Sequence, residues 1–187
     1  MDTGSGKPPG RPKRRSIRLR EYDYSRSGGY FVTVCVSNRE CLLGEIAGGA
    51  MLMNRYGLAT ALTLEWLKER YAYVDLDEWI VMPNHVHAII LIDRPDVGAV
   101  REPPVKVKPL GGLVGAFKTV SSKKINQICG TPGAMVWQRN YYEHVIRSEN
   151  ELERVRDYIY CNPQAWLSDP ENPHARGGSA GDRTGGS

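Results

Sequence analysis

The chain has 187 residues, of which 41% are hydrophobic and 25% are charged, values typical of one globular domain with short extensions. Its formal net charge of +4 excludes little by itself, but the charge is unevenly distributed. Residues 1–20 contain seven basic residues and one acidic residue, so this segment carries +6 and the rest of the chain −2. A basic arm on a nearly neutral body favours a polyanionic partner, although a solubilising tail fits the charge equally well.

The four cysteines, Cys35, Cys41, Cys129 and Cys161, show no CxxC spacing. No apolar segment follows the basic N-terminus, and the longest apolar run, residues 88–92, is far too short to span a bilayer. These features predict reduced thiols in a cytoplasmic protein and argue against secretion and membrane insertion.

Both ends of the chain are rich in Gly, Pro, Ser and Arg and have little apolar surface to offset the entropy of ordering. We expect a disordered basic arm over residues 1–15 and a disordered Gly-rich tail over residues 171–187. The intervening residues 16–170 are expected to form one domain, and no internal repeat divides them.

The first half of this domain contains three predicted strands and a helix. A β-branched and aromatic run predicts a strand over 30–37, and apolar residues at helical spacing predict a helix over 54–71. Two apolar runs, 77–82 and 85–92, are separated by the turn dipeptide Pro83-Asn84 and should pair as a hairpin. Four prolines in residues 94–111 indicate an exposed connection.

The second half predicts a helix over 113–128 and a strand over 136–146. Ser148 and Glu151 form a capping box that opens a final helix, expected to end at Cys161 because a residue before proline avoids the α region. The order β-α-β-β-α-β-α predicts an α+β fold of the ferredoxin-like (RRM-like) type, an antiparallel sheet with helices packed on one face.

His85 and His87 are two residues apart in a predicted strand, so both imidazoles should point from one face while Val86 and Ala88 point from the other. Two such imidazoles can chelate a divalent cation, but two structural histidines fit the same pattern. The position of the pair at the start of a very apolar strand favours a functional role, because polar groups buried there without partners are costly.

Tyr158 and Asn162 are four residues apart, so they lie on one stripe of the final helix. Leu152, Val155 and Ile159 mark the buried face, and the helical spacing places Tyr158 and Asn162 on its shoulder. There they could face a site on the sheet. A partly buried tyrosine and an asparagine that caps the helix C-terminus explain the pair without any function.

Three successive segments, MPNHVHAIIL, FKTVSSKKIN and VWQRNYYEHVIRSENELERVRDYIYCNP, resemble the motifs of the single-domain HUH tyrosine transposases of the REP-associated and IS200-like type. The resemblance covers about residues 17–168 in the family's order and spacing. It implies an α+β fold that cleaves single-stranded DNA at the foot of small hairpins. By this resemblance His85 and His87 are the HUH pair, Tyr158 is the nucleophile and Asn162 is a third metal ligand.

Many insertion-sequence members have Gln where this chain has Asn162, whereas the REP-associated branch resembles this chain. That difference favours a resident transposase over a mobile element, and the resemblance leaves both monomer and homodimer open. It also implies Mg²⁺ or Mn²⁺ as the cofactor, although imidazole ligands suit Zn²⁺ or Ni²⁺ equally well. Attack of the tyrosine on phosphorus would leave a free 3′-OH and a 5′-phosphotyrosine that conserves the phosphodiester bond energy.

Basic and aromatic side chains provide candidates for DNA contacts. Phosphate contacts are expected from the basic residues 11–20, the 113–128 helix and the last strand, namely Arg14, Arg15, Arg18, Lys118, Lys123, Lys124, Arg139 and Arg147. Trp137, Tyr141 and Tyr142 could stack on unpaired bases, although at least one of them should belong to the core. His144 is expected to be structural, and Trp66, Trp79 and Trp166 are assigned to packing.

Two other functions remain open from the sequence. One is a domesticated, catalytically inactive DNA-binding or regulatory protein, in which the histidines are structural. The other is a metallohydrolase, which is less favoured because no acidic residue close in sequence completes the histidine strand as a general base.

Overall fold

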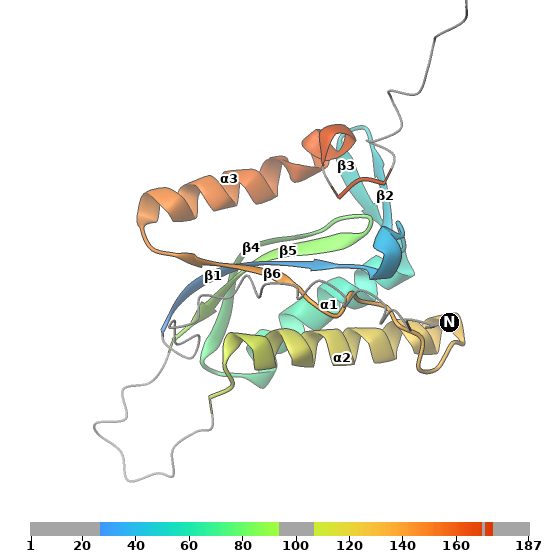
Figure 1. The fold of residues 1–187 in the computed structure, drawn as a ribbon, viewed down its shortest axis with the longest axis horizontal. Helices are drawn as coiled ribbons and strands as arrows, with labels where there is room; N and C mark the ends of the chain where they lie inside the picture. Colours follow the sequence, from blue (N-terminus) through green and yellow to red (C-terminus); the bar gives the residue numbers. More distant parts are fainter. Residues whose placement is uncertain (1–26, 94–106, 170, 174–187) are drawn as a thin grey trace, which may run out of the picture.

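The computed structural model describes residues 27–93, 107–169 and 171–173. Its centre is a four-stranded antiparallel sheet in the order β4-β5-β1-β6 (Figure 1). The strands are β1 (Gly28–Cys35), β4 (Val74–Val81), β5 (His85–Ile92) and β6 (Tyr142–Ile146). The antiparallel α+β class predicted from the sequence is confirmed, and the strand order is that of a ferredoxin-like sheet.

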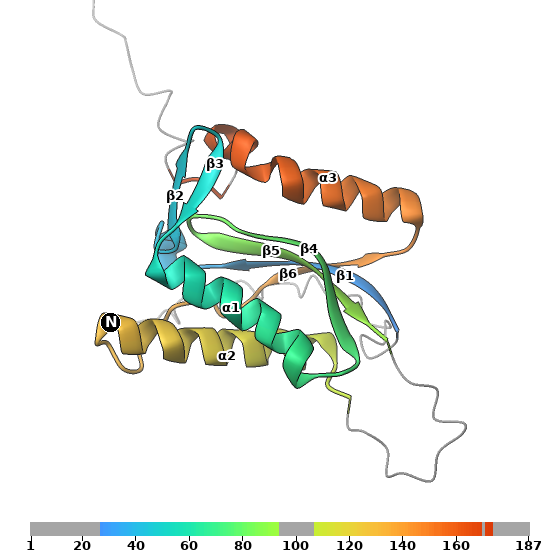
Figure 2. The same cartoon turned by 180° about the vertical axis from the view of Figure 1, so that it is seen from behind.

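Helices cover both faces of this sheet (Figures 1 and 2). Helices α1 (Arg55–Arg70) and α2 (Leu110–Cys129) pack side by side on one face, as predicted. Helix α3 (Glu149–Ala165) lies over the opposite face and is followed by a 3-10 turn, η2 (Trp166–Ser168). The expectation of helices on one face therefore holds for α1 and α2, whereas α3 adds a third layer.

Alternation along β5 divides the buried side chains between the two faces. Val86, Ala88 and Ile90 belong to the large apolar cluster between the sheet and the helices α1 and α2. Ile89 belongs instead to a small cluster with Phe31 and Ile159 beneath α3. His85 and His87 share the parity of Ile89, so both imidazoles point from one face of β5, as predicted, and that face is the one covered by α3.

Helix α1 begins where the side chain of Asn54 accepts hydrogen bonds from the backbone N–H groups of Tyr56 and Gly57, at 2.8 and 3.1 Å. Gly57 is required by close packing, since a Cβ there would collide with the carbonyl oxygen of Leu43. The predicted helix 54–71 is therefore confirmed to within a residue at each end.

Helix α3 begins as predicted, with the Ser148 side chain accepting a hydrogen bond from the Glu151 N–H. Its predicted end at Cys161 is wrong, because the helix continues through Pro163 to Ala165. Proline lacks an N–H, so its insertion costs one helical hydrogen bond. Ile159 and Trp166 are buried on either side of Pro163, and their packing holds the helix together across this position.

The predicted strand 136–146 is wrong in its first half, since only Tyr142–Ile146 forms β6. The backbone of Trp137 makes a single bridge to Val36, and its side chain lies in the large core, where Nε1–H donates to Ser121 Oγ at 2.8 Å. Helix α2 starts at Leu110 rather than 113. Because Leu110 is fully buried, the end of the predicted exposed connection 94–111 is also wrong, and residues 94–106 lie outside the described residues.

The remaining strand boundaries shift by two or three residues, with β1 starting at Gly28 and β4 at Val74. The sequence interpretation missed the hairpin of β2 (Gly44–Ala47) and β3 (Ala50–Met53). Its signal is the pair Gly48-Gly49, which both adopt positive φ in the turn between these strands. The strands have only four residues each and are largely exposed, so they carry little apolar pattern.

The predicted disordered arm over residues 1–15 lies outside the described residues. At the other end, residues 171–173, which the sequence assigns to the tail, pack against the body. Asn172 is buried, and its Nδ2 donates to the Trp166 carbonyl at 2.9 Å. Across the three described stretches, we find no helix that combines the length and hydrophobicity needed to cross a bilayer.

Candidate active site

The centre of the site is the histidine pair on β5. The Nε2 atoms of His85 and His87 are 3.0 Å apart, and both side chains are buried. His87 stacks on Phe31 of the neighbouring strand, and His85 lies near the ring of Trp166. The two imidazoles therefore converge on one point between the sheet and α3.

The opposite nitrogens of the two rings are held by neighbouring polar side chains. His85 Nδ1 lies 2.8 Å from Asn84 Oδ1, which makes this nitrogen the donor, and His87 Nδ1 lies 2.8 Å from Thr33 Oγ1. A protonated Nδ1 leaves Nε2 with a free lone pair. Hydrogen-bonded histidines with this orientation are typical of metal ligands.

Burial keeps both histidines neutral. It lowers the pKa of His85 to about 4, against a smaller opposing effect of Asp169, and it lowers the pKa of His87 well below the ordinary value, assisted by His85. Neutral imidazoles are the form that binds a metal ion, so the pair is ready to coordinate at neutral pH.

Tyr158 projects from α3 over the histidines. Its hydroxyl lies 3.4 Å from His87 Nε2, and its ring packs edge-on against Phe31 and His87. The side chain is 48% exposed, so a ligand can reach the hydroxyl. Burial of the rest of the ring, followed by the charge of Asp169, raises the pKa of Tyr158, while the nearby Asn162 amide lowers this pKa in part. The phenol is thus protonated at neutral pH.

Asn162 lies one turn beyond Tyr158 and is 2% exposed. Its amide lies against His85 and Tyr158, where it influences the pKa of both. In the described part of the chain, Asn162 Oδ1 has no hydrogen-bond partner. A buried oxygen without a donor is costly, so its position beside the histidines fits the predicted role of a metal ligand.

The structure adds Asp169, which the sequence interpretation missed. This buried carboxylate follows η2, and its oxygen lies with the nitrogens of His85 and His87 in a group whose ligand atoms are all within 4.8 Å of one another. Nothing in the local sequence pattern marks Asp169, because it reaches the histidines only through the turn after α3. The cluster therefore places a carboxylate beside the two predicted histidines.

A cavity of about 500 Å³ opens beside the pair and gives access to Tyr158. Arg39 and Glu171 line its wall and form an ion pair at 3.2 Å. Cys35 also lines it, and burial raises the pKa of this thiol to about 12, so it stays uncharged. Among the described residues, Arg39 is the one cation that lines this cavity, and the sequence analysis did not single it out.

Lys118 does not face this cavity as an open phosphate contact. Its ammonium group donates to the backbone carbonyls of Gln138, Arg139 and Asn140, at 3.0, 3.4 and 3.1 Å. It also lies over the ring of Tyr141, and burial lowers its pKa to about 8. Its three donors are used within the chain, so the expected phosphate contact is replaced by a structural one that holds the wall of the cavity.

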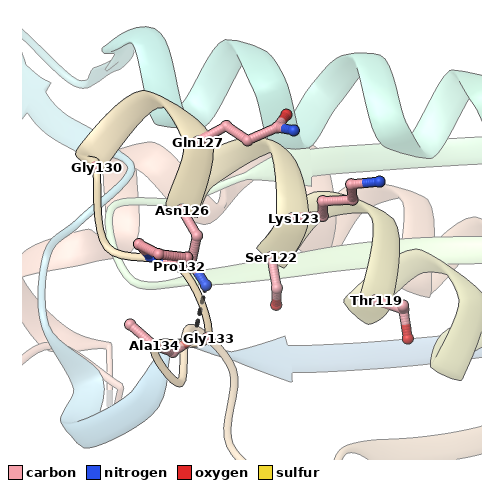
Figure 3. Close-up of a pocket in the computed structure, with 9 residues that line it drawn as sticks. All are labelled: Thr119, Ser122, Lys123, Asn126, Gln127, Gly130, Pro132, Gly133 and Ala134. Carbon is pink, nitrogen blue, oxygen red and sulfur yellow. Dashed lines mark hydrogen bonds between the residues drawn. The ribbon is translucent and has the colours of Figure 1, made fainter.

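The other predicted basic contacts are spread over the surface. Lys123 lines a separate hollow of about 680 Å³ at the C-terminal end of α2 (Figure 3), where Asn126 Nδ2 donates to the Ala134 carbonyl. Lys124 is on the same helix, so both lie across the sheet from the histidines. Arg139 and Arg147 are exposed at the two ends of the segment that contains β6. The predicted contacts near the N-terminus, Arg14, Arg15 and Arg18, lie outside the described residues.

The aromatic candidates divide as the sequence interpretation allowed. Trp137 is a core residue packed on Phe117, and Tyr141 is half-buried against the same core. Tyr142 is 46% exposed and lines the cavity, so it remains available for base stacking. The assignment of His144 is confirmed, because its Nε2 lies 2.6 Å from the capping residue Glu151. Trp66, Trp79 and Trp166 pack against their neighbours as expected.

No established protein-family model matches the chain. It is 37% identical over 169 residues to an uncharacterized protein of Haemophilus influenzae, a match that covers 83% of this chain and 91% of the relative. It is also 26% identical over 140 residues to the REP-associated tyrosine transposase of Escherichia coli, covering 75% of this chain and 68% of that protein.

The structure of a REP-associated tyrosine transposase bound to a REP hairpin has the same fold, with a TM-score of 0.54 and 24% identity over 92% of this chain and 96% of that chain. The fold, the clustered histidines and tyrosine, and these sequence relatives agree with the motifs in the sequence. The chain therefore belongs to the REP-associated tyrosine transposases, the REP-associated branch of the IS200-like HUH type.

Proposed function

We propose that this protein binds hairpin-forming single-stranded DNA and cuts and rejoins it through a covalent bond to Tyr158. The observation that carries the proposal is the convergence of Tyr158, His85 and His87 beside an open cavity, with the Asn162 amide against His85 and Tyr158. The relative bound to a REP hairpin supports a hairpin as the DNA ligand.

Tyr158 acts as the nucleophile in this proposal. Its oxygen attacks the scissile phosphorus, the bond to the 3′-oxygen breaks, and the products are a 5′-phosphotyrosine and a free 3′-OH. The phenolic proton leaves to water on the exposed side of the ring, and the 3′-oxygen takes up a proton in turn. Because one phosphodiester bond is exchanged for another, a second 3′-OH can reverse the step and join new ends.

The residues at the site fit a divalent cation, which the family resemblance implies. His85 Nε2, His87 Nε2 and Asn162 Oδ1 would hold the ion. When both histidines carry their proton on Nδ1, each of these three atoms has a free electron pair for the metal. When bound, such an ion stabilises the negative charge of the phosphate oxygens. Mg²⁺ or Mn²⁺ is the proposed ion.

The DNA is proposed to enter at the cavity, where Tyr142 can stack on an unpaired base. Exposed Arg139 and Arg147 are proposed to contact phosphates near this opening, and Lys123 and Lys124 those of DNA that extends to the other face. Near the N-terminus, Arg14, Arg15 and Arg18 are proposed to add non-specific attraction to DNA. A cytoplasmic location and a monomeric or homodimeric state remain predictions.

The direct test incubates the full chain with Mn²⁺ and a labelled hairpin oligonucleotide and separates the products on a denaturing gel. We expect a protein–DNA adduct with the wild type and none with Tyr158→Phe, while Tyr160→Phe, which alters an exposed tyrosine two residues away, keeps it. Binding without any adduct would instead support a regulatory protein. Cleavage without a protein-linked product would support a hydrolase.

A further inference from the structure

The segment that follows α3 turns back to the histidine pair and brings Asp169 with it. Asp169 is 6% exposed, its N–H donates to the Trp166 carbonyl at 3.1 Å, and its Oδ1 accepts from the Glu171 N–H at 2.7 Å. The backbone of the turn therefore fixes the carboxylate. Its position depends on local hydrogen bonds rather than on a bound ligand.

This segment is also tied to the histidines by one amide. Asn84 Oδ1 accepts from His85 Nδ1, while Asn84 Nδ2 donates to the carbonyl oxygens of Arg39 and Glu171, at 3.0 and 2.7 Å. Asn84 is itself buried, so these bonds are shielded from water. The ring orientation of His85 and the position of the Asp169 turn are thus set by the same side chain.

A buried carboxylate needs a compensating positive charge. Over the three described stretches, no lysine, arginine or histidine forms an ion pair with Asp169. When both histidines carry their proton on Nδ1, the groups that gather there are electron-pair donors. They are the imidazoles of His85 and His87, the Asp169 carboxylate and, against His85, the Asn162 amide. A divalent cation is the kind of group that balances such a cluster.

We propose that Asp169 is an anionic ligand of the divalent cation held by His85, His87 and Asn162. This inference rests on the proposed function, which assigns the cation to the other three residues. Those three ligands are neutral, so among the described residues of this cluster Asp169 alone brings a negative charge to the ion. A carboxylate and an amide oxygen beside two imidazoles favour Mg²⁺ or Mn²⁺ more than the two imidazoles alone do.

The test measures Mn²⁺ binding to the full chain by isothermal titration calorimetry in the absence of DNA. We expect Asp169→Asn to weaken Mn²⁺ binding by about tenfold or more, because the asparagine keeps the size and one oxygen but not the charge. Glu171→Gln is the matched control. This variant removes the Glu171 carboxylate, which lies on the same turn and pairs with Arg39. It should leave the affinity for Mn²⁺ close to that of the wild type.

Thermal unfolding provides a readout that a merely structural role would not reproduce. Without metal, Asp169→Asn should melt at or above the wild-type temperature, because it removes an unpaired buried charge but keeps the acceptor for the Glu171 N–H. With Mn²⁺, the wild type should gain a rise in melting temperature that Asp169→Asn largely loses. A structural role for Asp169 predicts the reverse, a lower melting temperature without metal and an unchanged rise with it.

His87→Ala separates this inference from the proposed function. Equal Mn²⁺ affinity in the wild type and Asp169→Asn, together with loss of binding in His87→Ala, would overturn the role of Asp169 and leave the proposed site intact. No Mn²⁺ binding by the wild type would overturn the metal site itself. Loss of affinity in both variants, with Glu171→Gln unaffected, would establish Asp169 as part of the site.

Discussion

Replacement of Ile159 by alanine should loosen helix α3 and separate the two halves of the site. Ile159 is fully buried, lies next to Tyr158 in sequence, and forms the small apolar cluster beneath α3 with Phe31 and Ile89. Among the described residues, this cluster has three buried members with partly buried side chains around them, so each buried member carries a large part of the attachment of the helix. None of these three residues belongs to the larger apolar cluster on the other face of the sheet.

The magnitude follows from the atoms removed. Ile159→Ala deletes three buried carbons, worth about 0.8 kcal/mol each, and leaves a cavity that adds to the loss. We expect a decrease of about 3–4 kcal/mol in the free energy of unfolding. Ile159→Val removes one carbon and should cost about 1 kcal/mol. Leu167→Ala, at a position 84% exposed, should change stability by less than about 0.5 kcal/mol.

Urea unfolding followed by circular dichroism measures these differences, and adduct formation measured at a temperature where all variants are folded reports on the site. Leu113→Ala, in the fully buried core beneath α2, is a control of similar cost that leaves α3 in place. Ile159→Ala should lower the adduct rate far more than Leu113→Ala does. Equal destabilisation by Ile159→Ala and Leu167→Ala, or equal slowing of the chemistry by both core variants, would show that Ile159 does not hold α3 over the histidines.

Three further outcomes are expected. The Arg156 guanidinium holds the pKa of Asp77 below its ordinary value, so the pair stabilises the fold at neutral pH and this contribution is lost as the pH falls through the lowered pKa of Asp77. Acid unfolding of Asp77→Asn should therefore start from a lower stability and show a weaker dependence on pH, and an unchanged profile would contradict the ion pair. Lys118→Met should weaken hairpin binding, measured by fluorescence anisotropy, because it releases the backbone of residues 138–140, and Lys118→Arg should restore part of the binding. Equal loss of binding in both variants would argue against this structural role of Lys118. Deletion of residues 1–15 should weaken DNA binding and flatten its salt dependence in a salt titration, with adduct formation intact at saturating DNA; loss of the adduct there would give the arm another role.

Much of the fold could be predicted because its elements carry strong local patterns. The alternation of β5 determined which face presents His85 and His87, and the spacing of Tyr158 and Asn162 placed both beside the apolar stripe of α3. These are relations within one element, governed by the periods of strand and helix. They survive small errors in the boundaries of the elements.

The errors arise where contacts distant in sequence outweigh local preference. Pro163 predicts a helix end, but burial of Ile159 and Trp166 carries the helix past it. Trp137 begins a run that alternates like a strand, yet its ring finds a deeper site in the core on Phe117. Lys118 was predicted to contact DNA because it is basic, but its three protons bind carbonyls twenty or more residues away. Each outcome depends on a partner that no local window contains.

The two halves of the site also differ in whether one element or several segments position them. The histidines come from one rigid strand in the centre of the sheet, while Tyr158, Asn162 and Asp169 all come from the continuous stretch formed by α3 and the turn after it. Ile159 and Trp166 attach this stretch to the sheet and to His85. Substitutions on the far side of the sheet can therefore lower stability without changing the site, whereas those beneath α3 move the phenol, the amide and the carboxylate together. The placement of one helix on one face of the sheet is what brings this chain's proposed nucleophile to its histidines.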